Sequence, residues 1–155
     1  MIQIEEIPAA RAGEFWELQF AYLVNDGMIA GEEEKAYFSS DGYRSTLEAY
    51  MSREPDRLHM VYFVEVGTRI GASQYCIYKS EDGKCFLLDF WIFPEYRGGG
   101  TGGACFQALE AYTARDGARY YALNYAKEAS RRFWLAHGFQ DDGVDEYGTS
   151  RMIRR

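Results

Sequence analysis

A run of seven residues, Arg97–Gly103, holds five glycines and constrains both the fold and the chemistry of this chain. It lies between a strongly apolar predicted strand, residues 84–93, and a predicted helix that extends to about Asp116. Glycine lets the backbone approach a ligand closely, and the start of a helix adds unpaired N–H donors and a partial positive charge. The segment therefore predicts a site for a phosphate or pyrophosphate. A flexible turn would explain one such glycine more easily than five.

The remaining elements are predicted from hydrophobic periodicity. Alternating residues predict a first strand at 2–5, and apolar residues at helical spacing predict helices at 8–24, 32–38 and 41–53. The middle of the chain is rich in β-branched and aromatic residues and predicts an antiparallel meander of strands 59–66, 72–78 and 84–93. Further patterns predict a strand at 119–124, a helix at 129–137 and a hairpin of 139–141 with 147–153. Because a strand–helix–strand unit spans 85–124, we expect an α/β (α+β) fold with a mixed sheet.

Composition narrows the classes of function. The 155 residues predict a single domain, 1–155, and the net charge of -7 argues against nucleic acid or an anionic membrane as a partner. Two histidines and three cysteines, none at metal-ligand spacing, argue against a metal site. The first residues lack the basic region and apolar run of a signal peptide, and no segment approaches the length of a membrane span, so we expect a cytoplasmic protein.

Three types of phosphate-binding loop compete for the glycine-rich segment. Gly98, Gly100 and Gly103 match G-x-G-x-x-G, but a dinucleotide-binding fold should begin with this motif and continue through several strand–helix units. A P-loop would need Gly-Lys-Ser/Thr, which is absent. The third type is Arg-x-x-Gly-x-Gly after a strand that ends in Pro-Glu-Tyr, and it matches the sequence from Pro94 through Gly102.

This third pattern resembles the GNAT N-acetyltransferase superfamily, through the stretch 90–104 and through a second stretch, 129–139, that ends in Gly-Phe. The resemblance implies a GNAT-like, mostly antiparallel mixed sheet flanked by about four helices, with acetyl-CoA as cosubstrate. It also implies two groups of cofactor-binding residues. The pyrophosphate loop would be Arg97, Gly98, Gly99, Gly100, Thr101, Gly102 and Gly103, and the strand that pairs with the pantetheine arm would contribute Ile92 and Phe93.

Two positions on and before the last predicted helix depart from the family pattern. Trp134 stands where the family often has a tyrosine that protonates the CoA sulfur, and Lys127 stands in place of an asparagine. Both positions remain candidates for cofactor contact. The missing tyrosine has three explanations: thiolate release needs no protein acid, another tyrosine such as Tyr121 or Tyr125 substitutes, or the domain binds acyl-CoA without turnover. We favour the first, because a thiol with a pKa near ~8.5 is a fair leaving group.

The candidate general base is Asp89, the only acidic residue within 86–93. In the family a carboxylate on the strand before the loop often has this role. Regular alternation would place Asp89 on one side of the strand with Leu87 and Trp91, although a bulge would change this. A structural role, in which the carboxylate bonds backbone or an arginine, has equal weight.

We therefore predict an acyl-CoA-dependent N-acetyltransferase that acts on the primary amine of a small or amino-acid-like acceptor, with a catalytically silent acyl-CoA-binding module as the alternative. Residues 1–96 hold 8 basic and 17 acidic side chains, whereas residues 97–155 hold 9 basic and 7 acidic ones. This asymmetry favours a cationic acceptor on the acidic half and an anionic cofactor on the other. Dimers are common in the family, so a homodimer is possible, although nothing in the sequence marks an interface.

Overall fold

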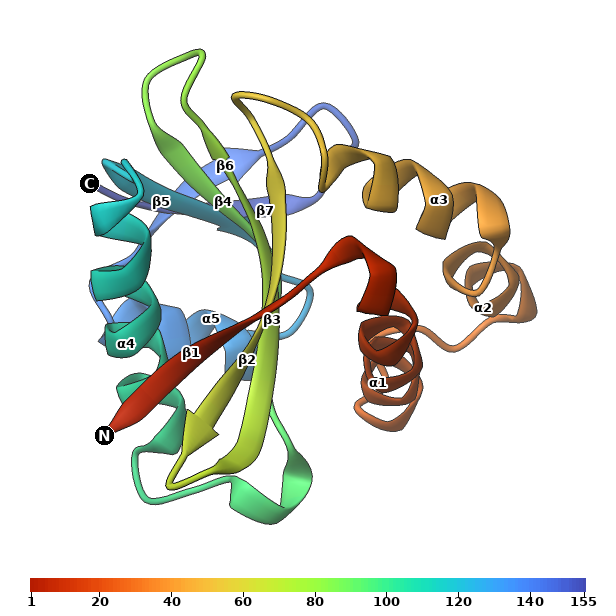
Figure 1. The fold of residues 1–155 in the computed structure, drawn as a ribbon, viewed down its shortest axis with the longest axis horizontal. Coiled ribbons are helices and arrows are strands. Elements are labelled where there is room, and N and C mark those ends of the chain that lie inside the picture. Colours follow the sequence, from red (N-terminus) through yellow and green to blue (C-terminus); the bar gives the residue numbers. More distant parts are fainter.

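A computed structural model describes residues 1–155, and one seven-stranded sheet runs through it in the order β1-β2-β3-β4-β5-β7-β6 (Figure 1). Neighbouring strands are antiparallel except β4 and β5, which are parallel. The strands are β1 (Ile2–Ile7), β2 (Leu58–Glu65), β3 (Thr68–Tyr78), β4 (Lys84–Ile92), β5 (Tyr120–Asn124), β6 (Gln140–Val144) and β7 (Ser150–Arg154). This mostly antiparallel mixed sheet confirms the predicted fold class.

Five helices cover the two faces of this sheet. Figure 1 shows α1, α2 and α3 on one side and α4 and α5 on the other. They are α1 (Ala12–Asn25), α2 (Glu32–Phe38), α3 (Asp41–Tyr50), α4 (Thr101–Arg115) and α5 (Glu128–Ala136). Two predicted helix boundaries were wrong. Pro8 precedes a short 3-10 turn at Ala9–Arg11 instead of opening α1, and α3 ends at Tyr50 instead of residue 53. No helix has both the length and the apolar character that crossing a bilayer requires.

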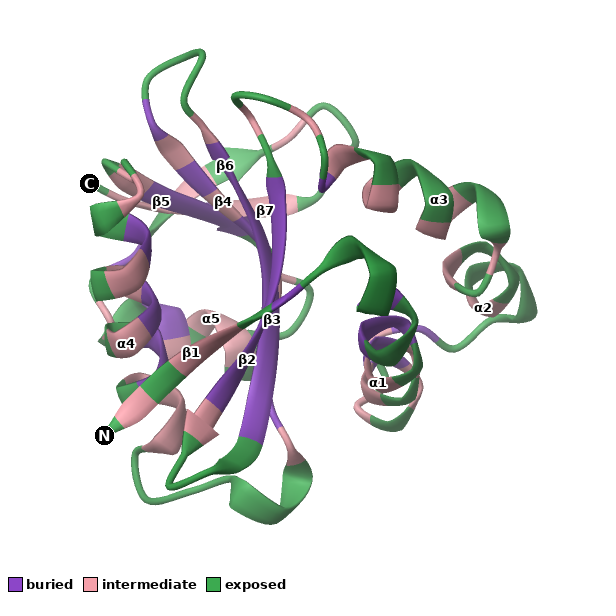
Figure 2. Cartoon of the chain, viewed as in Figure 1, coloured by how far each residue is buried: buried purple, intermediate pink, exposed green.

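Each face of the sheet carries its own hydrophobic core. The core under α4 and α5 includes Leu87, Phe106 and Phe139, and the core under α1 includes Phe15, Tyr62 and Trp91. Figure 2 shows the central strands buried, whereas α2 and α3 are largely exposed or intermediate. The α1 core is therefore covered less completely, and α2 and α3 have no fully buried residue.

The sheet opens between β4 and β5. Their parallel pairing runs from Lys84 with Tyr120 to Leu87 with Leu123 and then stops, while β4 continues to Ile92. On its other edge β4 stays paired with β3 as far as Ile92 opposite Gly71. The last part of β4 therefore has one paired edge and one free edge, which is the geometry needed to add an extended ligand as a strand.

Gly71 keeps β3 and β4 close at this point. A Cβ atom there would lie 2.6 Å from the Trp91 carbonyl oxygen and 3.1 Å from the side chains of Ile92 and Phe63. We expect Gly71→Ala to lower the free energy of unfolding by about 1–3 kcal/mol through overpacking. Gly13→Ala on α1 is the matched control, because a Cβ atom there meets nothing within 4 Å. Urea unfolding measures both, and equal stability of the two variants would contradict the close approach.

Candidate active site

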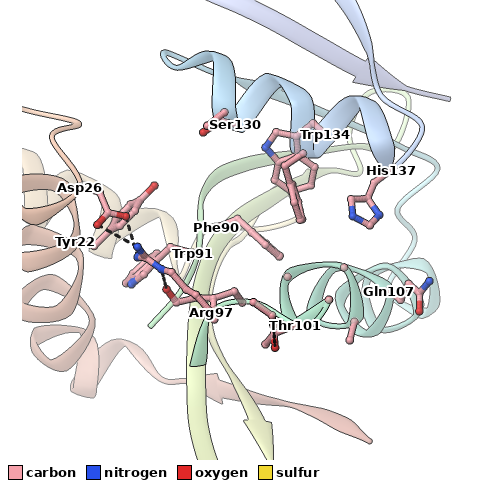
Figure 3. Close-up of a pocket in the computed structure, with 18 residues that line it drawn as sticks. Tyr22, Asp26, Phe90, Trp91, Arg97, Thr101, Gln107, Ser130, Trp134 and His137 are labelled. Atoms are coloured by element: carbon pink, nitrogen blue, oxygen red, sulfur yellow. Dashed lines mark hydrogen bonds and ion pairs between the residues drawn. The ribbon is translucent and has the colours of Figure 1, made fainter. Parts of the chain in front are cut away.

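A cavity of about 790 Å³ lies where α1, the end of β4, the glycine-rich loop, α4 and α5 meet (Figure 3). Its polar lining includes Asp26, Arg97, Ser130 and His137, together with the loop backbone. Its apolar lining includes the aromatic side chains of Tyr22, Phe90, Trp91, Phe133 and Trp134. The cavity joins the free edge of β4 to the start of α4, so one ligand can contact both.

The first three glycines of the loop adopt backbone conformations that other residues rarely take. Gly98, Gly99 and Gly100 have φ values of +94°, +62° and +79°. The N–H groups of these residues and of Gly102 and Gly103 donate to no protein acceptor, whereas Thr101 donates its N–H to the Gly98 carbonyl. Five free N–H groups at the start of a 15-residue helix form a concave donor surface suited to an anion.

The last two glycines, Gly102 and Gly103, are needed for close helix packing and not for their backbone conformation. A Cβ atom on Gly102 would lie 2.9 Å from the Phe133 ring, and one on Gly103 would lie 2.7 Å from the His137 ring. These positions therefore let the first turn of α4 pack directly against α5. His137, at the end of α5, lines the cavity and packs on Phe133 with 4.6 Å between ring centroids.

Arg97 connects the loop to α1 across the cavity. Its Nε donates to the Ile92 carbonyl at 2.8 Å, and its Nη2 pairs with the Asp26 carboxylate at 2.9 Å (Figure 3). The Lys127 ammonium, just before α5, donates to the Asp26 carbonyl. The two predicted cofactor cations are thus both held by Asp26, a residue that the sequence did not single out. Their contact with a phosphate stays a prediction.

The two predicted pantetheine-pairing residues differ in their backbone geometry. The Phe93 N–H donates to the Ile70 carbonyl at 2.9 Å, so it points toward β3. The backbone polar groups of Ile92, one residue earlier, point to the opposite edge of β4, where the Ile92 carbonyl accepts a hydrogen bond from Arg97. Ile92 is therefore better placed than Phe93 to pair with a ligand at the free edge of β4.

Trp134 is a buried part of the cavity wall. Its ring lies edge-on to Phe90, Phe106 and Phe139, with centroids 5.1, 5.3 and 5.0 Å away. Of the two alternative tyrosines, Tyr121 shares a 2.7 Å hydrogen bond with the Thr113 hydroxyl, and neither it nor Tyr125 lines the cavity. The one tyrosine that does is Tyr22, which stacks on Trp91 at 4.7 Å. Neither of the two tyrosines predicted as substitutes therefore lies at the cavity, whereas Tyr22 of α1 does.

Asp89 lies on the α1 face of β4. The expectation that it shares this face with Trp91 was correct, but the expectation that it shares it with Leu87 was wrong. A register shift pairs Gln74 with Asp89 but Tyr75 with Leu87, so Leu88 is an extra residue in β4. This bulge places Leu87 in the core under α4 and α5, opposite Asp89. The half-buried carboxyl accepts hydrogen bonds from Gln19 at 2.9 Å and Gln74 at 2.5 Å. Burial raises the pKa of Asp89 to about 6, although both hydrogen bonds act to lower it.

The site also contains residues that sequence patterns did not select. Asp26, Phe90, Phe133 and His137 line the cavity, and Gln19 and Gln74 hold Asp89. Asp26 follows the end of α1, and no periodic signal marks a residue that acts just beyond a helix. No group of three or more histidine, cysteine or acidic side chains is arranged to hold a metal ion.

The chain belongs to the GNAT acetyltransferase family. The model for the acetyltransferase (GNAT) family matches residues 18–139, which include β4, the glycine-rich loop and α5. No curated protein sequence matches the chain. The family, the free N–H groups of the loop and the open edge of β4 together define an acetyltransferase with acetyl-CoA as its cosubstrate.

Solved structures share this fold at low sequence identity. PaiA N-acetyltransferase from Thermoplasma acidophilum, in complex with coenzyme A, has a TM-score of 0.74 at 17% identity over 100% of this chain and 99% of that one. An acetyltransferase from Thermus thermophilus has a TM-score of 0.69 at 17% identity over 99% and 96%. An aminoglycoside acetyltransferase from an uncultured soil metagenomic sample, in complex with sisomicin, has a TM-score of 0.61 at 13% identity over 88% and 85%.

Proposed function

We propose that this chain acts as one domain that transfers the acetyl group of acetyl-CoA directly to the primary amine of a small or amino-acid-like acceptor, with Asp89 as general base. The observation that carries this proposal is the position of Asp89 in the part of β4 whose edge toward β5 is free. Asp89 does not itself line the cavity, but the next two residues, Phe90 and Trp91, do. The Oδ2 atom of Asp89 accepts both glutamine hydrogen bonds, while Oδ1 has no hydrogen-bond partner. With a pKa of about 6, Asp89 is mostly ionised at neutral pH and still basic enough to accept a proton.

The proposed acetyl-CoA site is centred on the free N–H donors of the glycine-rich loop. The N–H groups of Gly98, Gly99, Gly100, Gly102 and Gly103 would bind the pyrophosphate, and Arg97 and Thr101 line the same cavity. Lys127, which does not line the cavity and is held at the Asp26 carbonyl, would contact a phosphate from the start of α5. Ile92 would pair with the pantetheine arm at the free edge of β4, next to Phe93, and Trp134 would form the apolar wall near the sulfur. Acetyl-CoA supplies an acetyl group activated as a thioester. In this proposal that group would lie between β4 and α5, close to the α1 face of the sheet.

In this proposal Asp89 is the one side chain that takes part in proton transfer. An alkylamine is protonated at neutral pH and must lose a proton before its nitrogen can form a bond to the thioester carbonyl carbon. Asp89 Oδ1 accepts that proton directly or through a water. As the new C–N bond is completed, the C–S bond breaks and its electron pair leaves on sulfur, and the nitrogen loses its second proton to that thiolate or to water. A thiolate is stable enough to leave without a protein acid, which agrees with a tryptophan at position 134.

Trp134→Tyr tests whether thiolate release needs a protein acid at this position. We expect turnover to change by less than about tenfold, because thiolate departure does not limit the reaction. Some stability should be lost, since the indole packs against Phe90, Phe106 and Phe139. Steady-state kinetics at saturating acetyl-CoA measure the effect. A gain of several hundredfold would show that an acid had been missing.

The acceptor class rests on charge. The half of the chain that provides α1, α2 and α3 is acidic, and α2 begins with Glu32, Glu33 and Glu34, all exposed. We therefore propose a cationic amine as acceptor. A panel of diamines, aminoglycosides, neutral amino-acid amides and acidic amino acids tests this by thiol release. The proposal expects the highest kcat/KM for the diamines and aminoglycosides, with a decline at higher salt. A preference for acidic amino acids would contradict it.

The silent binding module remains the competing function, and the same assay separates the two. Tight acetyl-CoA binding by calorimetry without thiol release for any acceptor would favour the module. The silent module is supported by Trp134 and Lys127, the two residues that depart from the family pattern.

A further inference from the structure

Two glutamine side chains from different elements converge on one oxygen of Asp89. Gln19 Nε2, from α1, lies 2.9 Å from Asp89 Oδ2, and Gln74 Nε2, from β3, lies 2.5 Å from the same atom. Both glutamines have 0% exposure. The second hydrogen of the Gln19 amide goes to the Tyr43 hydroxyl of α3, 3.1 Å away. Asp89 is thus held from β3, α1 and, through Gln19, α3.

The β4 bulge is what brings these groups together. Gln74 is directly opposite Asp89 in the register, and the extra residue, Leu88, turns Asp89 toward α1. Without the bulge, Asp89 would point with Leu87 into the apolar core under α4 and α5.

This arrangement leaves hydrogen-bonding capacity unused inside the protein. The Oε1 atoms of Gln19 and Gln74 are both buried and have no hydrogen-bond partner. An unpaired buried carbonyl destabilises a fold, whereas apolar side chains of the same shape would fill the space without that penalty. The advantage of the amides therefore lies in their N–H groups, and each amide directs one N–H at Asp89.

We propose that Gln19 and Gln74 are positioning residues that fix the Asp89 carboxyl through Oδ2, so that Oδ1 is turned toward the acceptor amine. This inference rests on the proposed role of Asp89 as general base. It adds that the orientation and the ionisation of that base are set by two amides on separate elements. Neither glutamine touches the reacting atoms.

The electrostatic surroundings of Asp89 make these two amides decisive. No cation forms an ion pair with the carboxylate, so burial alone would favour its protonated form. The other titratable groups that face it are the Tyr22 hydroxyl of α1 and the Tyr43 hydroxyl of α3. Burial raises the pKa values of both, and the Asp89 charge raises them further. Both tyrosines are therefore neutral at physiological pH. The N–H donors of the glutamines are what stabilise the carboxylate.

Gln19→Met and Gln74→Met test the proposal, because methionine keeps the approximate volume and removes the donor. We expect the acid limb of the pH profile of kcat/KM to move up by about one pH unit in each variant, a tenfold loss on that limb. Activity should recover toward the wild-type value at high pH. The KM for acetyl-CoA should stay unchanged.

Ser73→Ala is the matched control. Ser73 is the β3 neighbour of Gln74 and is also buried, but its hydroxyl donates to the Asp89 backbone carbonyl at 2.6 Å and not to the carboxyl. We expect this variant to lose stability without moving the acid limb. A limb that moves in Ser73→Ala as much as in the glutamine variants would contradict the proposal.

Other outcomes separate this inference from the proposed function. If Asp89→Asn keeps the wild-type activity and pH profile, the general base is wrong. If Asp89→Asn removes the acid limb while both glutamine variants leave it in place, only the positioning role fails. Should Gln74→Met not fold, Gln19→Met together with a carbon-13 NMR titration of the Asp89 carboxyl gives the answer. An Asp89 pKa that stays at its wild-type value in Gln19→Met would overturn the inference.

Discussion

Asp89→Asn is expected to lower kcat/KM for the acceptor amine by about 10²–10⁴-fold, the usual contribution of a general base. Asparagine keeps the shape of the side chain and accepts the same two hydrogen bonds from Gln19 and Gln74, but it cannot take a proton. The acid limb near pH 6 should vanish, because the group that titrates there is gone. Initial rates across pH 5–9 measure both effects.

The same variant should not lose stability at neutral pH. The pKa of Asp89 is raised from 3.8 to about 6 on folding, so the folded state binds a proton more tightly than the unfolded chain. Stability of the wild-type protein therefore falls as the pH rises from about 4 to 6, and asparagine removes that loss. Urea unfolding at pH 5 and pH 8 checks the sign. An inactive variant that is also much less stable at pH 8 would point to a structural role instead.

Gly100→Asp is expected to weaken CoA binding by about 10- to 100-fold. Gly100 immediately precedes α4, has a φ of +79° and faces open space, so a side chain fits there without a clash, in the same loop as the free N–H groups. A carboxylate about 5 Å from a bound pyrophosphate would repel it by roughly 3 kcal/mol at an effective dielectric constant of about 20, before screening by salt. Calorimetric titration with CoA gives the affinity directly.

Gly100→Asn is the control for this change. Asparagine and aspartate tolerate positive φ about equally well, so both variants carry the same backbone strain and differ only in charge. We expect Gly100→Asn to stay within a few-fold of the wild-type affinity, and the gap between the two variants to narrow as salt is added. Equal affinities for both variants at low salt would mean that the pyrophosphate does not lie against this loop.

Much of the fold was accessible from the sequence because its elements follow simple periods. The meander, the loop and α4 are each marked by composition or spacing, and their bounds agree with the structure to within a few residues, except the start of β3. The family resemblance through the stretches 90–104 and 129–139 was confirmed by the match to the GNAT model. In both cases the informative residues are close in sequence and share one element or one junction.

What the sequence did not reveal depends on contacts between distant residues. The bulge at Leu88 inserts one residue into a run of apolar side chains, and no local pattern marks such an insertion. Asp26 meets Arg97 from 71 positions away, and Gln19 meets Asp89 from 70 positions away. The five glycines looked equivalent, whereas three serve positive φ values and two serve the packing of α4 on α5.

Thiol release from acetyl-CoA across the amine panel, with the product identified by mass spectrometry, decides whether this chain acetylates amines. We expect amine-dependent release of CoA, with one acetyl group on the nitrogen of a cationic amine and a rate that Asp89→Asn reduces at least a hundredfold. Acetyl-CoA that binds tightly but releases no thiol with any amine would contradict this function. An acetyl group found only on hydroxyl oxygen would contradict it as well.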